Sequence, residues 1–469
     1  MDYETFIASK VLAVEPAGID DPPDVSESLF PFQRDIVRWA LQRGRAAIFA
    51  DTGLGKTRMQ LEWAKHVAAH TGGRVLILAP LAVAAQTVRE GKACGVEVTY
   101  ARAQEDASCG ITITNYEMLT HFDPAQFAGV VLDESSILKA YSGKVKRRLV
   151  ESFARTPFRL ACTATPAPND HLELGNHAEF LGVMTSHEMI ARWFLPDTST
   201  FGTYRLKGHA VDPFWDWVSS WARCVGKPSD LGYQDEGFSL PELRTRRHVL
   251  DVDVTVGRGA RLFREPDMSA TSVHQEKRLT AGARAAKVAE IVAAEPDEPW
   301  IIWAETDYEA DALLDVIPDA VEVRGSDPTE RKEDAALWFC GEPCERFAHR
   351  RRVLISKAKI FGWGMNWQHC ARVAFVGPTF SYEQFYQAIR RSWRYRQTRA
   401  VDVHIVMAQT EVDVWSVLTR KAGEHEAMKA AMFAAAKRAH ARHEARQRGY
   451  NPTHVGRLPA WMTSERRAA

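Results

Sequence analysis

One short segment, residues 50–57 with the sequence ADTGLGKT, constrains the fold more than any other part of the chain. It follows an apolar run at residues 46–50 and precedes a stretch whose apolar side chains recur at helical spacing. Glycines between a strand and a helix let backbone N–H groups close around phosphate oxygens at the helix N-terminus. The segment therefore predicts a nucleoside triphosphate site on an α/β fold, although Ala50 stands where the full pattern has glycine.

Short apolar runs alternate with helical stretches in two parts of the chain, residues 28–185 and 281–420. Runs of this kind are typical of strands buried on both faces, and their alternation with helices predicts doubly wound parallel sheets. The expected strands are residues 46–50, 75–79, 111–114, 130–132 and 160–162 in the first part, and 300–303, 321–323, 353–355, 373–376 and 401–406 in the second. We therefore expect two α/β domains in tandem.

The remaining segments lack this rhythm. Residues 1–27 are acidic and proline-bearing and are interpreted as a leader. Residues 186–280 are rich in aromatic side chains and are interpreted as a mainly helical accessory or linker region, whose aromatics form either a small core, the favoured interpretation, or a base-stacking surface. Residues 421–469 form a basic helical tail, which is either a solvated helix or an arm that contacts phosphates.

Composition excludes several classes of protein. The 469 residues hold 60 Lys and Arg against 60 Asp and Glu, so a polybasic coat is excluded but a local basic groove is not. No apolar run is long enough to cross a membrane and no secretory signal is evident. Seven scattered cysteines indicate reduced thiols, and the close pair Cys340 and Cys344 lacks a second pair at zinc spacing. These features predict a cytoplasmic protein, and a monomer is the default expectation.

Two further motifs complete a site for phosphate chemistry. Asp133 and Glu134 end the apolar run at residues 130–132, where a carboxylate is expected to share Mg²⁺ with Thr57 and a second to orient the attacking water. Arg391 and Arg394 lie three residues apart in the arginine-rich segment 387–397, so on a helix they share one face. They are suited to reach the γ-phosphate from across a domain cleft.

Taken in chain order, these motifs resemble those of superfamily 2 helicases and translocases, most closely the switch/sucrose-nonfermenting remodelling-ATPase branch and its compact phage and prophage members. The resemblance spans about residues 28–420 and implies two RecA-like domains that bind ATP and Mg²⁺ between them. The motifs that carry it are residues 29–33, the loop at 50–57, residues 113–117, Asp133 with Glu134, residues 163–166 with Asn169, residues 356–366, and Gln387 with Arg391 and Arg394.

The resemblance also implies roles for individual residues. Those expected at the nucleotide are Phe32, Gln33, Gly53, Leu54, Gly55, Lys56, Thr57, Asp133 and Gly364, with Lys56, Glu134, Arg391 and Arg394 catalytic. Those expected at the nucleic acid are Thr165, Lys357, Lys359 and Asn366. The chain departs from the family at Ser136, where many relatives carry histidine, and at Phe361 and Trp363, which are bulkier than usual. The first departure puts in doubt the usual link between residues 133–136 and residues 163–166.

The sequence thus predicts an ATP-dependent helicase or translocase on nucleic acid, DNA in preference to RNA, in a bacterium or a phage-infected host. Several alternatives stay open. They are a duplex-DNA translocase that never separates strands, an RNA helicase, a nucleotide-gated binding module with slow turnover, and the motor subunit of a restriction, modification or phage replication or recombination assembly. The last would need a phage or host DNA-processing partner.

Overall fold

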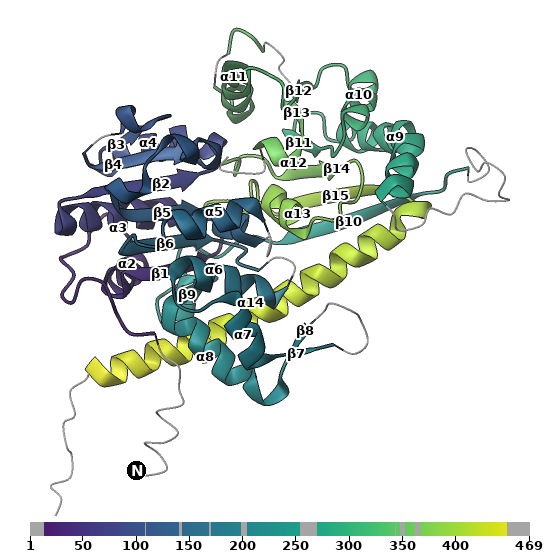
Figure 1. The fold of residues 1–469 in the computed structure, drawn as a ribbon. Coiled ribbons are helices and arrows are strands. Elements are labelled where there is room, and N and C mark those ends of the chain that lie inside the picture. The colour runs from purple at the N-terminus through teal and green to yellow at the C-terminus, as the bar shows by residue number, and fades with distance from the viewer. Residues whose placement is uncertain are drawn as a thin grey trace, which may run out of the picture.

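A computed structural model describes residues 14–107, 109–139, 143–167, 170–197, 204–253, 270–342, 344–347, 352–361 and 366–447. Within these ranges the chain forms two parallel sheets, each flanked by helices, that lie beside one another, with a long C-terminal helix running below both (Figure 1). This arrangement confirms the predicted class of two doubly wound α/β domains with a helical C-terminal segment.

The first sheet has seven strands in the order β3-β4-β2-β5-β6-β1-β9, all parallel. Five of its strands coincide with the predicted runs, whereas β3 and β9 had no prediction. The strands are β1 (Arg45–Ala50), β2 (Arg74–Ala79), β3 (Val98–Tyr100), β4 (Ile111–Asn115), β5 (Phe127–Asp133), β6 (Phe158–Thr163) and β9 (Ala222–Val225).

The second sheet has six parallel strands in the order β10-β15-β14-β11-β13-β12. All five predicted strands are present, and β10 is an additional edge strand with largely exposed side chains. The strands are β10 (Leu243–Leu250), β11 (Trp300–Trp303), β12 (Val321–Val323), β13 (Val353–Ser356), β14 (Arg372–Phe375) and β15 (Val401–Ala408). A separate antiparallel hairpin is formed by β7 (Phe194–Pro196) and β8 (Tyr204–Leu206).

Helices cover both faces of each sheet. The helices around the first sheet are α2 (Pro31–Arg43), α3 (Lys56–Thr71), α4 (Leu81–Ala93), α5 (Lys144–Ser152), α6 (Leu174–Leu181), α7 (Ser186–Trp193) and α8 (Val211–Trp221). Those of the second part are α9 (Ala270–Ala293), α10 (Asp307–Val316), α11 (Thr329–Cys340), α12 (Ala358–Phe361), α13 (Tyr382–Ile389) and α14 (Val412–Gln447). None of the helices within these described residues is both long and apolar enough to cross a membrane.

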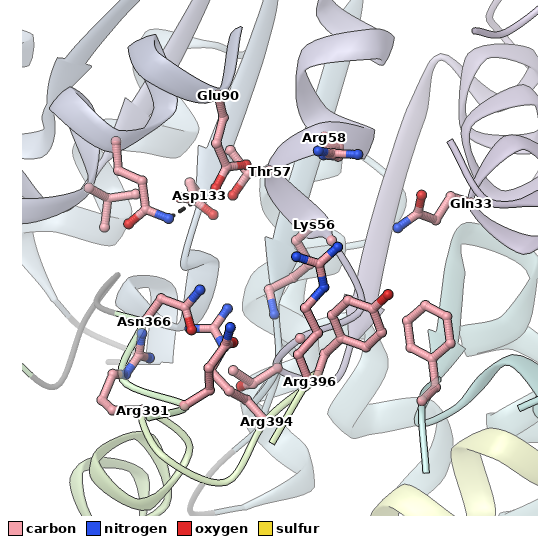
Figure 2. A pocket seen from close by; sticks show the side chains of 18 of the residues that line it. Gln33, Lys56, Thr57, Arg58, Glu90, Asp133, Asn366, Arg391, Arg394 and Arg396 are labelled. Atoms are coloured by element: carbon pink, nitrogen blue, oxygen red, sulfur yellow. Dashed lines mark hydrogen bonds between the residues drawn. The ribbon is translucent and has the colours of Figure 1, made fainter. Parts of the chain in front are cut away.

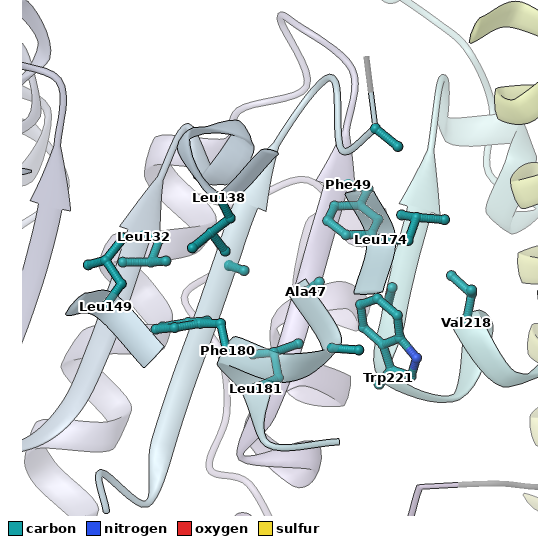
Figure 3. Close-up of a cluster of buried hydrophobic side chains, with 14 of the residues drawn as sticks. Ala47, Phe49, Leu132, Leu138, Leu149, Leu174, Phe180, Leu181, Val218 and Trp221 are labelled. Carbon is teal, nitrogen blue, oxygen red and sulfur yellow. The ribbon is translucent and has the colours of Figure 1, made fainter. Parts of the chain in front are cut away.

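The strands of the first sheet carry apolar side chains on both faces, which is why each face needs a layer of helices. On one face Phe49 and Leu132 pack with Phe180 of α6 and Trp221 of α8 (Figure 3). On the other face Ile48 packs with side chains of α2 and α3. Because the strands are parallel, the loops after β1, β5 and β6 lie at the same edge of this sheet.

Residues 186–280 are tied to both sheets. Strand β9 extends the first sheet next to β1, and β10 extends the second next to β15. Most of the described aromatic side chains between residues 193 and 221 are buried, with Trp193 and Trp217 packed at a ring-centroid distance of 4.5 Å, whereas Tyr204 is exposed. This confirms the interpretation of these aromatics as a core and excludes a base-stacking surface built from them.

Helix α14 packs against both domains. Near its start, Trp415 and Leu418 belong to the core of the second sheet. Further along, Met428 and Met432 are buried in the core of the first. The tail expected at residues 421–469 to be either a solvated helix or a phosphate-contacting arm is thus helical as far as Gln447, and from Met428 it packs against the first domain by apolar side chains that the basic composition concealed; residues 448–469 lie outside the described residues.

Candidate nucleotide and nucleic-acid site

The predicted phosphate-binding loop joins β1 to α3 as expected. Gly53 and Gly55 have φ angles of 93° and 78°, a region that side chains with a Cβ rarely adopt. Helix α3 begins at Lys56, so its first N–H groups face the loop. The Lys56 Nζ donates to the carbonyl oxygen of Ala50 at 2.9 Å. That contact places the ammonium group inside the loop, where its hydrogen bond can be exchanged for one to a phosphate oxygen.

Gln33 lies against the same loop. Its Nε2 donates to the carbonyl oxygen of Leu54 at 2.8 Å, and its Oε1 accepts from the Phe30 N–H at 2.9 Å. A Cβ added at Gly55 would lie only 2.4 Å from the Gln33 Nε2, so the end of that side chain would have to move, and the positive φ is what favours glycine there. Gln33 therefore fixes the shape of the loop and lines the nucleotide cavity at the same time.

Strand β5 ends in the two predicted carboxylates. Asp133 is buried and its Oδ1 accepts a hydrogen bond from Gln60 Nε2 at 2.7 Å. Glu134 has a φ of 54°, which costs a side chain with a Cβ of order 1 kcal/mol and is found mainly at functional sites. Burial raises the pKa of Glu134 to about 7, against the opposing effect of Lys56. A carboxylate with this pKa is suited to accept a proton near neutral pH.

A contact joins the carboxylate pair to residues 163–166, the link that Ser136 had put in doubt. The Thr163 hydroxyl donates to Glu134 Oε2 over a long 3.4 Å and accepts from the Thr165 N–H at 3.1 Å. Ser136 itself is buried. The neighbouring Ser135 hydroxyl contacts His177 Nε2 at 3.1 Å. In this chain Glu134 makes the connection directly, without a histidine at position 136.

The second domain presents arginines to the same cavity. Arg391 lies two residues after the end of α13 and Arg394 lies in the turns beyond it, so the expectation that the two share one face of a helix was wrong. Arg391 hydrogen-bonds the Gln387 backbone and side-chain oxygens at 3.1 and 2.8 Å. Burial lowers the pKa of Arg391 to about 9 and that of Arg394 to about 10. Both line a cavity of about 340 Å³ together with Lys56, Thr57, Asp133 and Glu134 (Figure 2). Every predicted catalytic residue therefore faces one space between the two domains.

Aromatic side chains lie at the loop side of the cavity, as expected for a base site. Phe30 lines it, whereas the predicted Phe32 is buried in the core of the first domain. Phe238 and Tyr395 stack on each other at 4.6 Å and also line the cavity. Neither Phe238 nor Tyr395 was predicted, because the two lie far apart in the sequence and no spacing pattern links them.

The oxygen ligands present fit Mg²⁺. Burial raises the pKa of Asp133, which shows a carboxylate short of positive charge. A divalent cation held by this carboxylate and the Thr57 hydroxyl would supply that charge, and phosphate oxygens and water normally complete such a shell. Within the described residues no group of three or more His, Cys, Asp or Glu side chains could hold a metal by itself.

The predicted nucleic-acid residues occupy different places. Lys357 follows β13 and pairs with Asp307 at 2.7 Å, and Lys359 is exposed on α12. Thr165 is fully buried and its hydroxyl oxygen has no hydrogen-bond partner. Asn366 lines the nucleotide cavity, close to Arg391 (Figure 2). Gly364, Trp363 and Asn169 lie outside the described residues.

Three charged residues at the site had no prediction. Glu90 of α4 lines the cavity near Asp133 and is hydrogen-bonded by Gln86 at 3.0 Å. Arg390 and Asp51 form a buried ion pair that joins the two domains. The density of arginines in residues 387–397 pointed to Arg390, but nothing in the sequence indicated that Asp51 would be its partner.

The fold resembles that of many solved structures. The chain matches a Sulfolobus solfataricus SWI2/SNF2 ATPase core in complex with dsDNA, with 16% identity and a TM-score of 0.42, over 91% of this chain and 98% of that one. No family model matches the sequence, and no curated protein matches it.

Proposed function

We propose that this protein is a nucleic-acid-stimulated ATPase that translocates along DNA. The observation that carries the proposal is the composition of the cavity between the domains. One wall supplies Lys56, Thr57, Asp133 and Glu134, and the other supplies Arg391 and Arg394. This set matches the parts that phosphoryl transfer to water requires: a phosphate cradle, metal ligands, a base and positive charge for the transition state.

Each residue has a defined task in the proposed reaction. The loop N–H groups and Lys56 bind the β- and γ-phosphates, and Glu134 accepts a proton from the attacking water. Arg391 and Arg394 stabilise the charge that develops on the γ-phosphate oxygens. Mg²⁺ held by Thr57 and Asp133 would neutralise charge on the β- and γ-phosphates. Among the groups of ATP, the γ-phosphate is the one expected to contact both domains, so its hydrolysis removes a contact that favours the closed cleft.

Nucleic acid is proposed to lie across both domains, with Lys357 and Lys359 at the contact. Thr165 is buried and Asn366 lines the nucleotide cavity, so neither is placed at the nucleic acid. Lys357 and Lys359 are suited to phosphate oxygens, which position a strand without reading its sequence. A net charge of zero is compatible with such binding, because only a local basic surface is required. Sequence specificity should therefore be low and affinity should fall steeply with salt.

The decisive experiment is ATP hydrolysis by the purified protein with no polymer, single-stranded DNA, duplex DNA or RNA. Duplex DNA is expected to stimulate at least about tenfold, equal to about 1.4 kcal/mol of barrier. Lys56→Ala should abolish the activity, and Glu134→Gln should reduce it by about 10²–10⁴-fold while nucleotide still binds. Stimulation by RNA alone would identify an RNA helicase. Hydrolysis that depends on Lys56 but ignores every polymer would leave only a nucleotidase.

Strand separation is tested separately. We expect the protein to displace the third strand of a DNA triplex without unwinding the duplex, because a motor that follows the backbone need not part the strands. Unwinding of a tailed duplex in the same buffer would instead identify a helicase.

A further inference from the structure

Asp51 begins the phosphate-binding loop, but its side chain faces away from the nucleotide. It lines a second cavity of about 340 Å³ behind the loop. Thr52 and Gly53 line both cavities, so the loop is the wall between them. The Asp51 Oδ1 also accepts from the Thr52 N–H at 2.7 Å. The carboxylate is therefore attached directly to the part of the loop that must enclose phosphate.

The partners of this carboxylate come from two other elements. The Tyr386 hydroxyl and the Arg390 guanidinium, at the end of α13, both donate to Asp51. Lys429 of α14 lies 3.3 Å from its Oδ2. All four residues are less than one tenth exposed. Burial would raise the pKa of Asp51, but the two cations together hold it well below its usual range, so the carboxylate is charged.

The position of these partners gives the cluster its importance. Arg390 directly precedes Arg391, so fixing one fixes the backbone that carries the other. Lys429 lies on α14 after the residues that pack in the second domain and beside Met428, which packs in the first. A shift of the loop on nucleotide binding would thus move both the backbone that carries the arginines and the C-terminal helix α14.

We propose that Asp51 is a positioning residue: by holding Tyr386, Arg390 and Lys429 to the phosphate-binding loop, it aligns Arg391 with bound nucleotide and couples the loop to helix α14. The proposal rests on the function proposed above, since alignment matters only if the cavity hydrolyses ATP. The carboxylate bridges the phosphate-binding loop to the end of α13, beside the arginines of the opposite wall, and to α14.

The test compares Asp51→Asn with Asp51→Glu, Lys429→Met and the matched control Asp235→Asn. Asp235 lines the same second cavity but is hydrogen-bonded to Ser229 instead of Arg390. Asp51→Asn should lower kcat at least tenfold while the affinity for Mg²⁺·AMP-PNP, measured by calorimetry, stays within threefold. Asp51→Glu should recover most of the loss, Lys429→Met should give a smaller loss, and Asp235→Asn should give none.

Amide exchange supplies a second reading of the coupling. Mg²⁺·AMP-PNP should slow exchange in α13 and α14 of the wild type but not of Asp51→Asn. The proposal is overturned if Asp51→Asn retains kcat, or if kcat and affinity fall together, which would indicate a role in loop shape alone. If Asp51→Asn does not fold, Lys429→Met decides by the same criteria.

A failure of the proposed function gives a different result from a failure of the proposed coupling. A wild type without ATPase activity would refute the function. Amide exchange measured without nucleotide would then test whether Asp51 couples the loop to α13 and α14. Faster exchange of α13 and α14 in Asp51→Asn than in Asp235→Asn would support it. Equal exchange in the two variants would overturn it.

Discussion

Arg284 and Arg391 are both buried arginines of the second domain, but their surroundings differ. Arg284 of α9 is fully buried and has carboxylates built around it. Its Nη1 lies 2.7 Å from Glu309 Oε1, and its Nε lies 3.5 Å from Glu411 Oε2. All three residues belong to one domain, so this cluster can persist however the cleft moves.

Arg391 instead hydrogen-bonds the neutral oxygens of Gln387 and borders an open cavity, with Glu134 on the opposite wall. Burial lowers the pKa of Arg391 to about 9, against the opposing effect of Glu134 and Asp133 on the facing wall, so the group is charged near neutral pH. The difference teaches how to distinguish the two uses of a buried arginine. Counter-charges from the same domain indicate a part of the fold, whereas counter-charges on the facing domain, across a cavity, indicate a site for an anion that binds between them.

Removing Arg391 should have the largest effect of the changes considered. Arg391→Ala is expected to lower polymer-stimulated ATP hydrolysis by about 10³–10⁵-fold, the range known for arginines that reach a γ-phosphate. Thermal stability should change little, because the variant also removes the cost of burying the charge. Single-turnover hydrolysis beside a melting curve measures both. A rate within about tenfold of the wild type would show that Arg391 is not at the transition state.

Breaking the other cluster should affect folding instead. Glu309→Gln leaves the charge of Arg284 buried and less compensated, and the loss is expected to be about 3–5 kcal/mol of unfolding free energy. Urea titration of the full chain measures it. The matched control is Glu290→Gln on the same helix as Arg284, which breaks an exposed pair with Lys287 and should cost at most about 1 kcal/mol. Equal losses in the two variants would refute the distinction drawn between the arginines.

Most strands of the fold could be predicted from the sequence, because strands buried on both faces appear as short apolar runs. The strands that were missed lack that signature. Residues 98–100 form only a short strand, and β10 is an exposed edge strand with three arginines among its eight residues. Strand β9 was concealed by the aromatic-rich sequence before it. Edge and short strands are fixed by their neighbours more than by their own composition.

The first-domain wall of the site was predictable because its parts are local. The residues of the loop and of the carboxylate pair follow their strands directly, so sequence spacing alone brings them to one edge. The opposite wall depends on tertiary packing. The stacking of Phe238 on Tyr395 and the pairing of Asp51 with Arg390 join residues more than 150 positions apart, and no spacing rule predicts them.

Glu309 and Glu134 differ in the same way as Arg284 and Arg391: one belongs to an ion pair within the fold and the other lines the cavity. Arg284 lowers the pKa of Glu309 against the effect of burial, whereas the pKa of Glu134 is raised to about 7. If Glu134 is the base, kcat/KM should fall about tenfold per pH unit below about pH 7. The linkage to stability has the opposite sign. A raised carboxyl pKa favours the folded state at low pH, and that contribution is lost as the pH rises through about 7.

A pH–rate profile from pH 5.5 to 8.5 at constant ionic strength tests the assignment. Glu134→Gln should remove the acidic limb from whatever activity remains. A limb that persists in that variant would belong to another group.

Helix α14 connects the cluster around Arg284 with the cluster around Asp51, and Gly423 lies between the residues that contact each. Glu411, just before the helix begins, pairs with Arg284, and Lys429 pairs with Asp51 beside Arg390. A Cβ added at Gly423 would meet nothing within 4 Å, so packing does not require glycine there. Gly423→Ala should therefore stabilise the protein by about 1 kcal/mol in urea titration, the usual gain inside a helix.

Gly282→Ala is the matched control, because Gly282 is likewise inside a helix, α9, with open space around it, but that helix belongs to one domain. Both variants should gain similar stability, and Gly282→Ala should leave hydrolysis unchanged. If Gly423→Ala also slows DNA-stimulated hydrolysis, α14 bends at Gly423 when the cleft opens, because a stiffer helix resists only motions that bend it. If both variants hydrolyse ATP at the wild-type rate, α14 does not bend at Gly423 during the cycle. In that case either the Glu411–Arg284 contact or the Lys429–Asp51 contact must break in each cycle.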